Sequence, residues 1–114
     1  MKRDIILFVE DILECIKKIE LYTKDILSNT EFSENALIID GVVRNLEIIG
    51  EAVKNIPEEF RKKYPEVPWK DIAGFRDKLS HAYFGVDLER VWNILGKDLS
   101  GLKKEIKDIL DKEK

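Results

Sequence analysis

The chain has few of the residues from which common enzyme sites are built. Its 114 residues include one cysteine, Cys15, and one histidine, His81. A single cysteine excludes an intrachain disulfide and favours a reducing compartment. One His and one Cys cannot assemble a His/Cys zinc site within one chain. Glycine-rich phosphate loops, Gly-x-Ser-x-Gly elbows and Asp-x-Asp calcium loops are absent as well. We therefore expect no metal ion and no cofactor.

Long apolar runs are also missing. No apolar stretch approaches the ~20 residues that a membrane span requires, and acidic residues at 10, 11 and 14 interrupt the apolar pattern after Met1, unlike a signal peptide. Apolar residues make up 44% of the chain and charged residues 38%, a balance that excludes both a disordered tail and a membrane protein. We expect one cytoplasmic domain that spans residues 1–114.

The chain lacks an excess of positive charge. Twenty basic and 23 acidic side chains give a net charge of −3. Proteins that coat nucleic acid through their bulk charge are usually strongly basic. The composition therefore argues against this class, but it permits a local phosphate site built from two or three cations.

Apolar residues at steps of three and four are the most abundant pattern in the chain. This spacing is typical of amphipathic helices. It predicts four of them and allows a short extra helix between the second and third, over residues 3–27, 33–56, 58–64, 68–84 and 88–109. Four helices with short connections favour an all-α, antiparallel bundle of four to five helices. The stripes of the first and last helices are long enough for a bundle core, a dimer seam or both.

Helix ends have their own signals. Ser33 and Asp87 are expected to cap the second and last long helices, because their side chains accept hydrogen bonds from free backbone N–H groups. Pro68 suits the first position of the third long helix, and Gly85 is expected to stop it near Phe84. Gly96, Ser100 and Gly101 weaken the last helix, which predicts a bend or a break there.

One segment, Gly74 to Gly85, differs from ordinary helix surface. It places His81 five residues after Arg76 and two before Tyr83. Histidine exchanges protons near neutral pH, and arginine grips phosphate through its planar fork of donors. Phosphodiester cleavage needs both a proton shuttle and a cation on the developing charge. The segment therefore contains the residue types of a phosphodiester-cleaving site.

Helical geometry limits how these residues meet. At about 100° per residue, Arg76 and Tyr83 share one face of a straight helix, whereas His81 lies roughly 140° from Arg76. Either the turn opens near His81, or a second chain completes the site. A lone histidine near a helix end is also commonly structural, so the spacing leaves both roles open.

Charged residues on the second long helix show a further pattern. The series Asp40, Arg44, Glu47 and Glu51 has the spacing of pairs along one helix face. It predicts a ladder of salt bridges that faces solvent or a dimer partner.

Three blocks of the sequence resemble one known family. The order Arg-x4-His-x-Tyr, with Asp77 directly after the arginine, resembles the signature of the HepT-like ribonuclease toxins of the HEPN superfamily. The block over 43–52 resembles the second helix of that family. The blocks over 68–76 and 83–88 resemble its run into and out of the motif. The similarity covers nearly the whole chain.

The resemblance implies a HEPN-like helical dimer whose two motif segments face each other across a cleft. It implies metal-independent RNA cleavage in which the RNA 2′-hydroxyl is the nucleophile. On this chain, His81 is then the general base or acid, Arg76 the phosphate clamp, and Asp77 a supporting residue that orients one of them. Tyr83 is the residue to which a partner antitoxin, a small MNT-type nucleotidyltransferase, adds AMP.

The resulting hypothesis is an endoribonuclease that acts as the toxin of a toxin–antitoxin module. Its expected partners are RNA, the nucleotidyltransferase and a second copy of the chain. The alternative is a non-catalytic helical dimer that binds the nucleotidyltransferase and uses the motif as a docking surface. RNA turnover by the purified protein separates the two.

Overall fold

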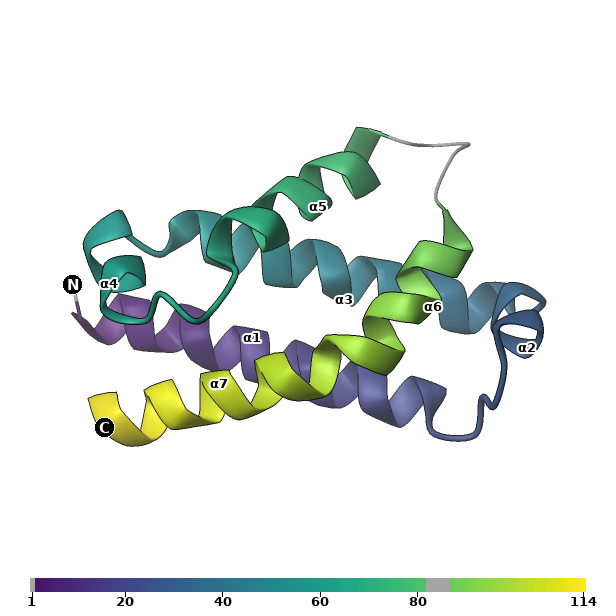
Figure 1. Ribbon diagram of the computed structural model, residues 1–114, viewed down its shortest axis with the longest axis horizontal. Coiled ribbons are helices and arrows are strands. Elements are labelled where there is room, and N and C mark those ends of the chain that lie inside the picture. The colour runs from purple at the N-terminus through teal and green to yellow at the C-terminus, as the bar shows by residue number, and fades with distance from the viewer. Residues whose placement is uncertain (1, 82–86) are drawn as a thin grey trace.

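A computed structural model describes residues 2–81 and 87–114, apart from the side chains of Lys2, Ser80 and His81. Within these residues the chain is all-helical, as predicted (Figure 1). It has seven helices, where four to five were predicted, and no strand. In chain order the helices are α1 (Lys2–Thr23), α2 (Asn29–Ser33), α3 (Ala36–Asn55), α4 (Glu58–Lys63), α5 (Trp69–His81), α6 (Leu88–Lys97) and α7 (Leu99–Glu113).

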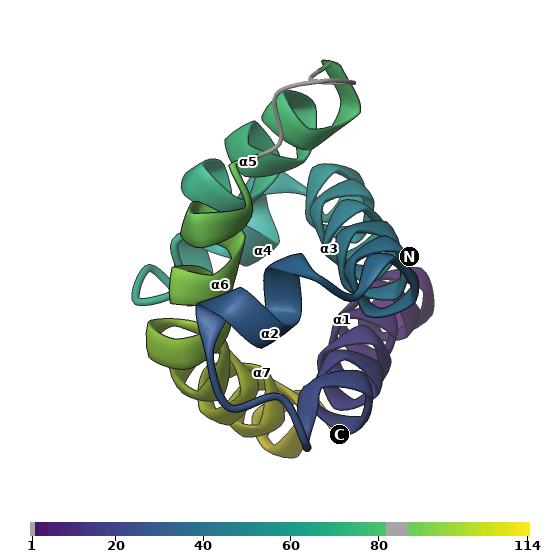
Figure 2. The same cartoon turned by 90° about the vertical axis from the view of Figure 1, so that its right-hand side faces the viewer.

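The long helices run antiparallel to their neighbours. Helix α1 lies between α3 and α7, which both return along it, so the two ends of the chain lie at one end of the long axis (Figure 1). Helix α5 packs on α3. Helix α2 lies at the end of the bundle away from the two chain termini, where it contacts α6 (Figure 2). Helix α3 therefore packs against α1 on one side and against α5 on another.

The apolar stripe of α1 forms the centre of the core. Val9, Ile12, Ile16 and Ile19 are at most 1% exposed. They belong to one buried cluster with residues of α3 and α7, including Val42, Ile49, Val53, Ile106 and Ile109. Each such side chain contributes about 1.5–3 kcal/mol when it leaves water. Burial of this stripe explains why the three longest helices follow the predicted periodicity.

The connection between α1 and α3 differs from the prediction. Helix α1 ends at Thr23 rather than at 27, and Leu27 is 83% exposed, so it adds nothing to the buried stripe. Ser33 ends α2, a short helix that the sequence did not predict, and does not cap α3. The α3 cap is Asn35, whose Oδ1 accepts from the Ile38 N–H at 3.0 Å. The expected Ser33 cap is therefore wrong.

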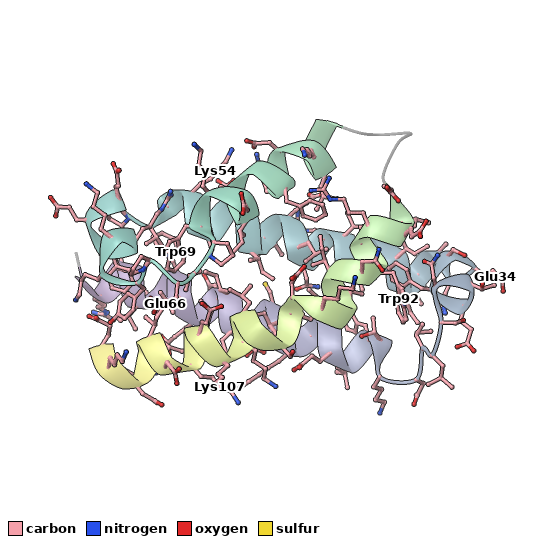
Figure 3. The ribbon with its side chains drawn as sticks, viewed as in Figure 1. Glu34, Lys54, Glu66, Trp69, Trp92 and Lys107 are labelled. Carbon is pink, nitrogen blue, oxygen red and sulfur yellow. The ribbon has the colours of Figure 1, made fainter. Side chains whose placement is uncertain are left out.

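Tertiary packing explains α2. Phe32 is fully buried, and its ring centroid lies 5.5 Å from that of Trp92. Trp92 extends from α6 toward α2 (Figure 3). Ser28 caps this helix by accepting from the Glu31 N–H at 3.2 Å. One buried aromatic residue, supplied with a partner from a distant helix, thus stabilises a helix of five residues that would not persist alone.

The remaining predicted ends agree more closely with the structure. Asp87 caps α6 through a 3.2 Å hydrogen bond from the Arg90 N–H. The predicted break in the last helix is confirmed, at Asp98 between α6 and α7. Pro68 precedes the first residue of α5 and accepts from the Ile72 N–H at 3.1 Å. The expected stop at Gly85 lies outside the described residues.

No helix in the described part of the chain combines the length and the apolar content that crossing a membrane requires.

Candidate functional site

The candidate site is built where α5 crosses α3. A Cβ atom added at Gly50 would lie 2.1 Å from Cβ of Arg76 and 2.6 Å from its Cγ, closer than real Cβ atoms approach. Only glycine fits here, because it brings the backbone of α3 directly under the stem of Arg76. The position from which the arginine side chain starts is thus fixed by backbone packing.

The guanidinium group of Arg76 is held from both helices. Its Nη2 lies 3.0 Å from Oε2 of Glu51 in α3, and its Nη1 lies 3.4 Å from Oδ1 of Asp77. The Nε atom of Arg76 is buried and has no hydrogen-bond partner among the described residues. The side chain remains 30% exposed, so part of the guanidinium stays accessible.

Asp77 is held by a lysine from α3. Lys54 donates a hydrogen bond from Nζ to Oδ1 of Asp77 at 2.5 Å. This hydrogen bond is the main reason why the pKa of the Asp77 carboxyl lies below its ordinary value, and Arg76 lowers the pKa further. Lys54 lies at the α3–α5 edge of the bundle (Figure 3). Asp77 is therefore an anion at neutral pH, placed beside Arg76.

A hollow of about 250 Å³ opens beside Arg76. Residues of α1 and α3 line it together with Arg76, among them Phe8, Arg44 and Glu51. Its lining mixes apolar and charged side chains, and it is open to solvent. Because Arg76 and Glu51 both line the hollow, a ligand bound there would lie beside the Arg76 side chain.

The opposite face of α5 borders a larger groove of about 1290 Å³, which α6 and α7 close on the other side. Arg90 of α6 places its guanidinium carbon 5.4 Å from the ring centroid of Phe75 across this groove. Arg76 is not among its lining residues, so the groove and the hollow lie on different faces of α5.

The structure describes the backbone of His81 and no part of Tyr83. His81 is the last described residue of α5, and the helix is unbroken from Arg76 to His81. The His81 side chain and the whole of Tyr83 lie outside the described residues. The structure therefore brings Arg76 and Asp77 together with two α3 residues, while the roles of His81 and Tyr83 stay predictions.

The sequence pattern did not identify Glu51 and Lys54 as site residues. Glu51 was assigned to a ladder along its own helix, but it pairs across to α5. The one local signal was Gly50, a glycine inside an otherwise apolar and charged helix, which can indicate a close helix contact. Among the described side chains, no three His, Cys, Asp or Glu residues are placed to hold a metal ion together.

Comparison with known proteins gives a consistent result. Residues 12–109 match the family model described as "Ribonuclease HepT-like". No solved structure matches the chain.

The relatives come from archaea and bacteria. A Methanocaldococcus jannaschii protein, named as a gamma-glutamylcyclotransferase and an inferred RNase, is 47% identical over 97% of this chain, which covers 50% of that protein. An inferred RNase of Caldanaerobacter subterraneus is 51% identical over 77% of this chain and 79% of its own length. An inferred ribonuclease HepT of Thermococcus cleftensis is 46% identical over 90% of this chain and 93% of its own. The chain thus spans half of the first relative and most of the other two.

Proposed function

Because the chain belongs to the HepT-like ribonuclease family, we propose that it is a metal-independent endoribonuclease. The observation that carries this proposal is the placement of Arg76, a part-exposed guanidinium beside an open hollow, on the same helix as His81. Relatives that are 46–51% identical and are named as inferred ribonucleases support it.

The reaction that we propose starts with the RNA 2′-hydroxyl. A base removes its proton, the 2′-oxygen attacks the adjacent phosphorus, and the bond from phosphorus to the 5′-oxygen breaks. The leaving 5′-oxygen takes up a proton. The products are a 2′,3′-cyclic phosphate and a 5′-hydroxyl. In this scheme His81 transfers one of the protons, and Arg76 binds the phosphate whose negative charge is redistributed in the transition state.

The test of the function uses purified protein and labelled single-stranded RNA, with and without EDTA. We expect cleavage in both conditions and the two product ends named above. A protein that cuts no RNA but forms a stable complex with a nucleotidyltransferase would instead support the non-catalytic alternative. Cleavage that disappears with EDTA would contradict the mechanism.

We also propose that two copies of the chain complete the site. An unbroken helix from Arg76 to His81 keeps the two residues roughly 140° apart around the axis. One chain then presents them to different sides, and a second motif segment across a cleft supplies the missing group. We expect light scattering to give the mass of a dimer at micromolar concentration. A monomer that retains full cleavage activity would overturn this arrangement.

The final part of the proposal is regulation by a partner. The ribonuclease would be the toxin of a toxin–antitoxin module, and an MNT-type nucleotidyltransferase would transfer AMP from ATP to the Tyr83 hydroxyl, with release of pyrophosphate. The seven-residue spacing predicts that Tyr83 shares the helix face of Arg76, so AMP groups would add bulk and negative phosphate charge near the proposed phosphate site. We therefore expect the modified protein to cut RNA poorly, and Tyr83→Phe to stay active while it resists silencing.

Intact-mass spectrometry after incubation with the nucleotidyltransferase and ATP measures the modification. We expect a mass gain in multiples of AMP for the unaltered protein and none for Tyr83→Phe. Tyr22→Phe is the matched control, since Tyr22 is 39% exposed on α1 and should not change the mass gain. A gain that persists in Tyr83→Phe would place the target elsewhere.

A further inference from the structure

Four charged residues join α3 to α5 in an unbroken series of contacts. Glu51 contacts Arg76 at 3.0 Å, Arg76 contacts Asp77 at 3.4 Å, and Asp77 contacts Lys54 at 2.5 Å. Glu51 and Lys54 are three residues apart, so they share one face of α3. That face is the one on which α5 lies, because Gly50 directly underlies Arg76.

These contacts contribute little to the stability of the fold. The side chains of Glu51, Lys54 and Asp77 are 54%, 37% and 47% exposed. Ion pairs at such exposure are screened by water and add little to the free energy of unfolding. What they change is the orientation of Arg76, whose stem is already fixed by the contact with Gly50.

The orientation of Arg76 matters because its guanidinium has a limited number of donors. Of its five N–H groups, one on Nη1 donates to Asp77 and the Nε–H is buried, while Nη2 forms an ion pair with Glu51 at 3.0 Å. The N–H groups left for a phosphate are on Nη1 and Nη2. Glu51 determines where these groups point, because it holds Nη2 from the side of α3 and lines the same hollow as Arg76.

Lys54 acts on the same group through Asp77. The carboxylate of Asp77 is close enough to compete with a phosphate for Arg76. By donating to the same oxygen, Oδ1, that contacts Arg76, Lys54 offsets the charge of the carboxylate. Without Lys54, Asp77 is free to pair more closely with Arg76.

We propose that Glu51 and Lys54 are positioning residues of the ribonuclease site, an inference that rests on the proposed function. Glu51 orients the Arg76 guanidinium toward the scissile phosphate, and Lys54 weakens the pairing of Asp77 with that guanidinium. Neither residue touches the reacting atoms. The phosphate site is therefore built from two helices, with Arg76 on α5 and its positioning residues Glu51 and Lys54 on α3.

The two residues should affect different kinetic constants. Misplacement of a group by about 1 Å costs on the order of 100-fold in rate, so we expect Glu51→Ala to lower kcat about 10- to 100-fold with little change in KM. Glu51→Gln keeps the shape but loses the charge, and should give a smaller loss. Lys54→Met should raise KM several-fold, because Asp77 then competes with the RNA phosphate. Glu58→Ala, which removes an exposed carboxylate on α4, is the matched control and should leave both constants unchanged.

A double-mutant cycle tests whether Glu51 acts through Arg76. In an Arg76→Ala background, Glu51→Ala should cause no further loss in single-turnover cleavage, because the group that it orients is gone. An equal loss in both backgrounds would show that Glu51 acts independently of Arg76. Thermal unfolding is followed for each variant, and Glu51→Gln replaces Glu51→Ala if the latter does not fold.

The outcomes separate this inference from the function on which it rests. Wild-type protein that cuts RNA, together with Glu51 variants of unchanged kcat, would overturn the inference alone. Wild-type protein that cuts no RNA would overturn the proposed function and the positioning role with it. A fall in kcat for Glu51→Ala that vanishes in the Arg76→Ala background supports both.

Discussion

RNA cleavage by His81→Ala is expected to be ~10²–10⁴-fold slower than by the unaltered protein, because proton transfer by a positioned side chain contributes about this much. The measurement is single-turnover cleavage of labelled RNA at neutral pH. Thermal unfolding of the variant is measured in parallel, and a melting temperature equal to that of the unaltered protein assigns the loss to chemistry. Activity that survives the substitution would contradict the assignment of His81 as the proton-transfer residue.

Arg76→Lys complements this experiment. Lysine keeps the charge, but an ammonium group cannot make the contacts of the guanidinium to Glu51 and Asp77 and still offer a planar fork to a phosphate. We expect it to lose most of its activity as well. Cleavage at the wild-type rate by Arg76→Lys would show that only charge is required at this position.

Gly50→Ala is expected to disturb the structure more than alanine at any other glycine that the structure describes. The added Cβ would stand 2.1 Å from Cβ of Arg76, and neither atom can move without its helix. Overpacking of this kind costs about 1–3 kcal/mol, which corresponds to a fall in Tm of roughly 4 °C or more. Because α5 must shift to make room, RNA cleavage should fall with stability.

Other glycines of the same chain supply matched controls. A Cβ atom at Gly74, Gly96 or Gly101 would meet nothing within 4 Å. Alanine at these helical positions should therefore raise stability by about 0.5–1 kcal/mol, since it restricts the unfolded chain and exposes less backbone. The measurement is a comparison of the melting temperatures of Gly50→Ala and Gly74→Ala. Equal melting temperatures would show that the contact between α3 and α5 at Gly50 is not close.

The sequence by itself determined the helical class and most of the helices. An amphipathic stripe depends on residues three and four apart, so the periodicity in α1, α3 and α7 could be read without knowledge of the fold. The cap at Asp87 and the break near Gly96 are local for the same reason. The motif order also marked Arg76 and Asp77, which the structure places side by side.

Only the tertiary structure decided which residues support that motif. Glu51 and Arg76 are 25 positions apart, and Lys54 and Asp77 are 23 apart, so no local spacing joins them. In the sequence, Glu51 fitted a ladder along its own helix equally well. Glu51 pairs with Arg76 because α3 and α5 cross at Gly50, where the absence of a side chain lets the two backbones approach. Helix α2 follows the same logic, because the burial of Phe32 depends on a ring that α6 brings from 60 positions away. Helix periodicity is a local property of the chain, whereas contacts between helices depend on how whole surfaces pack.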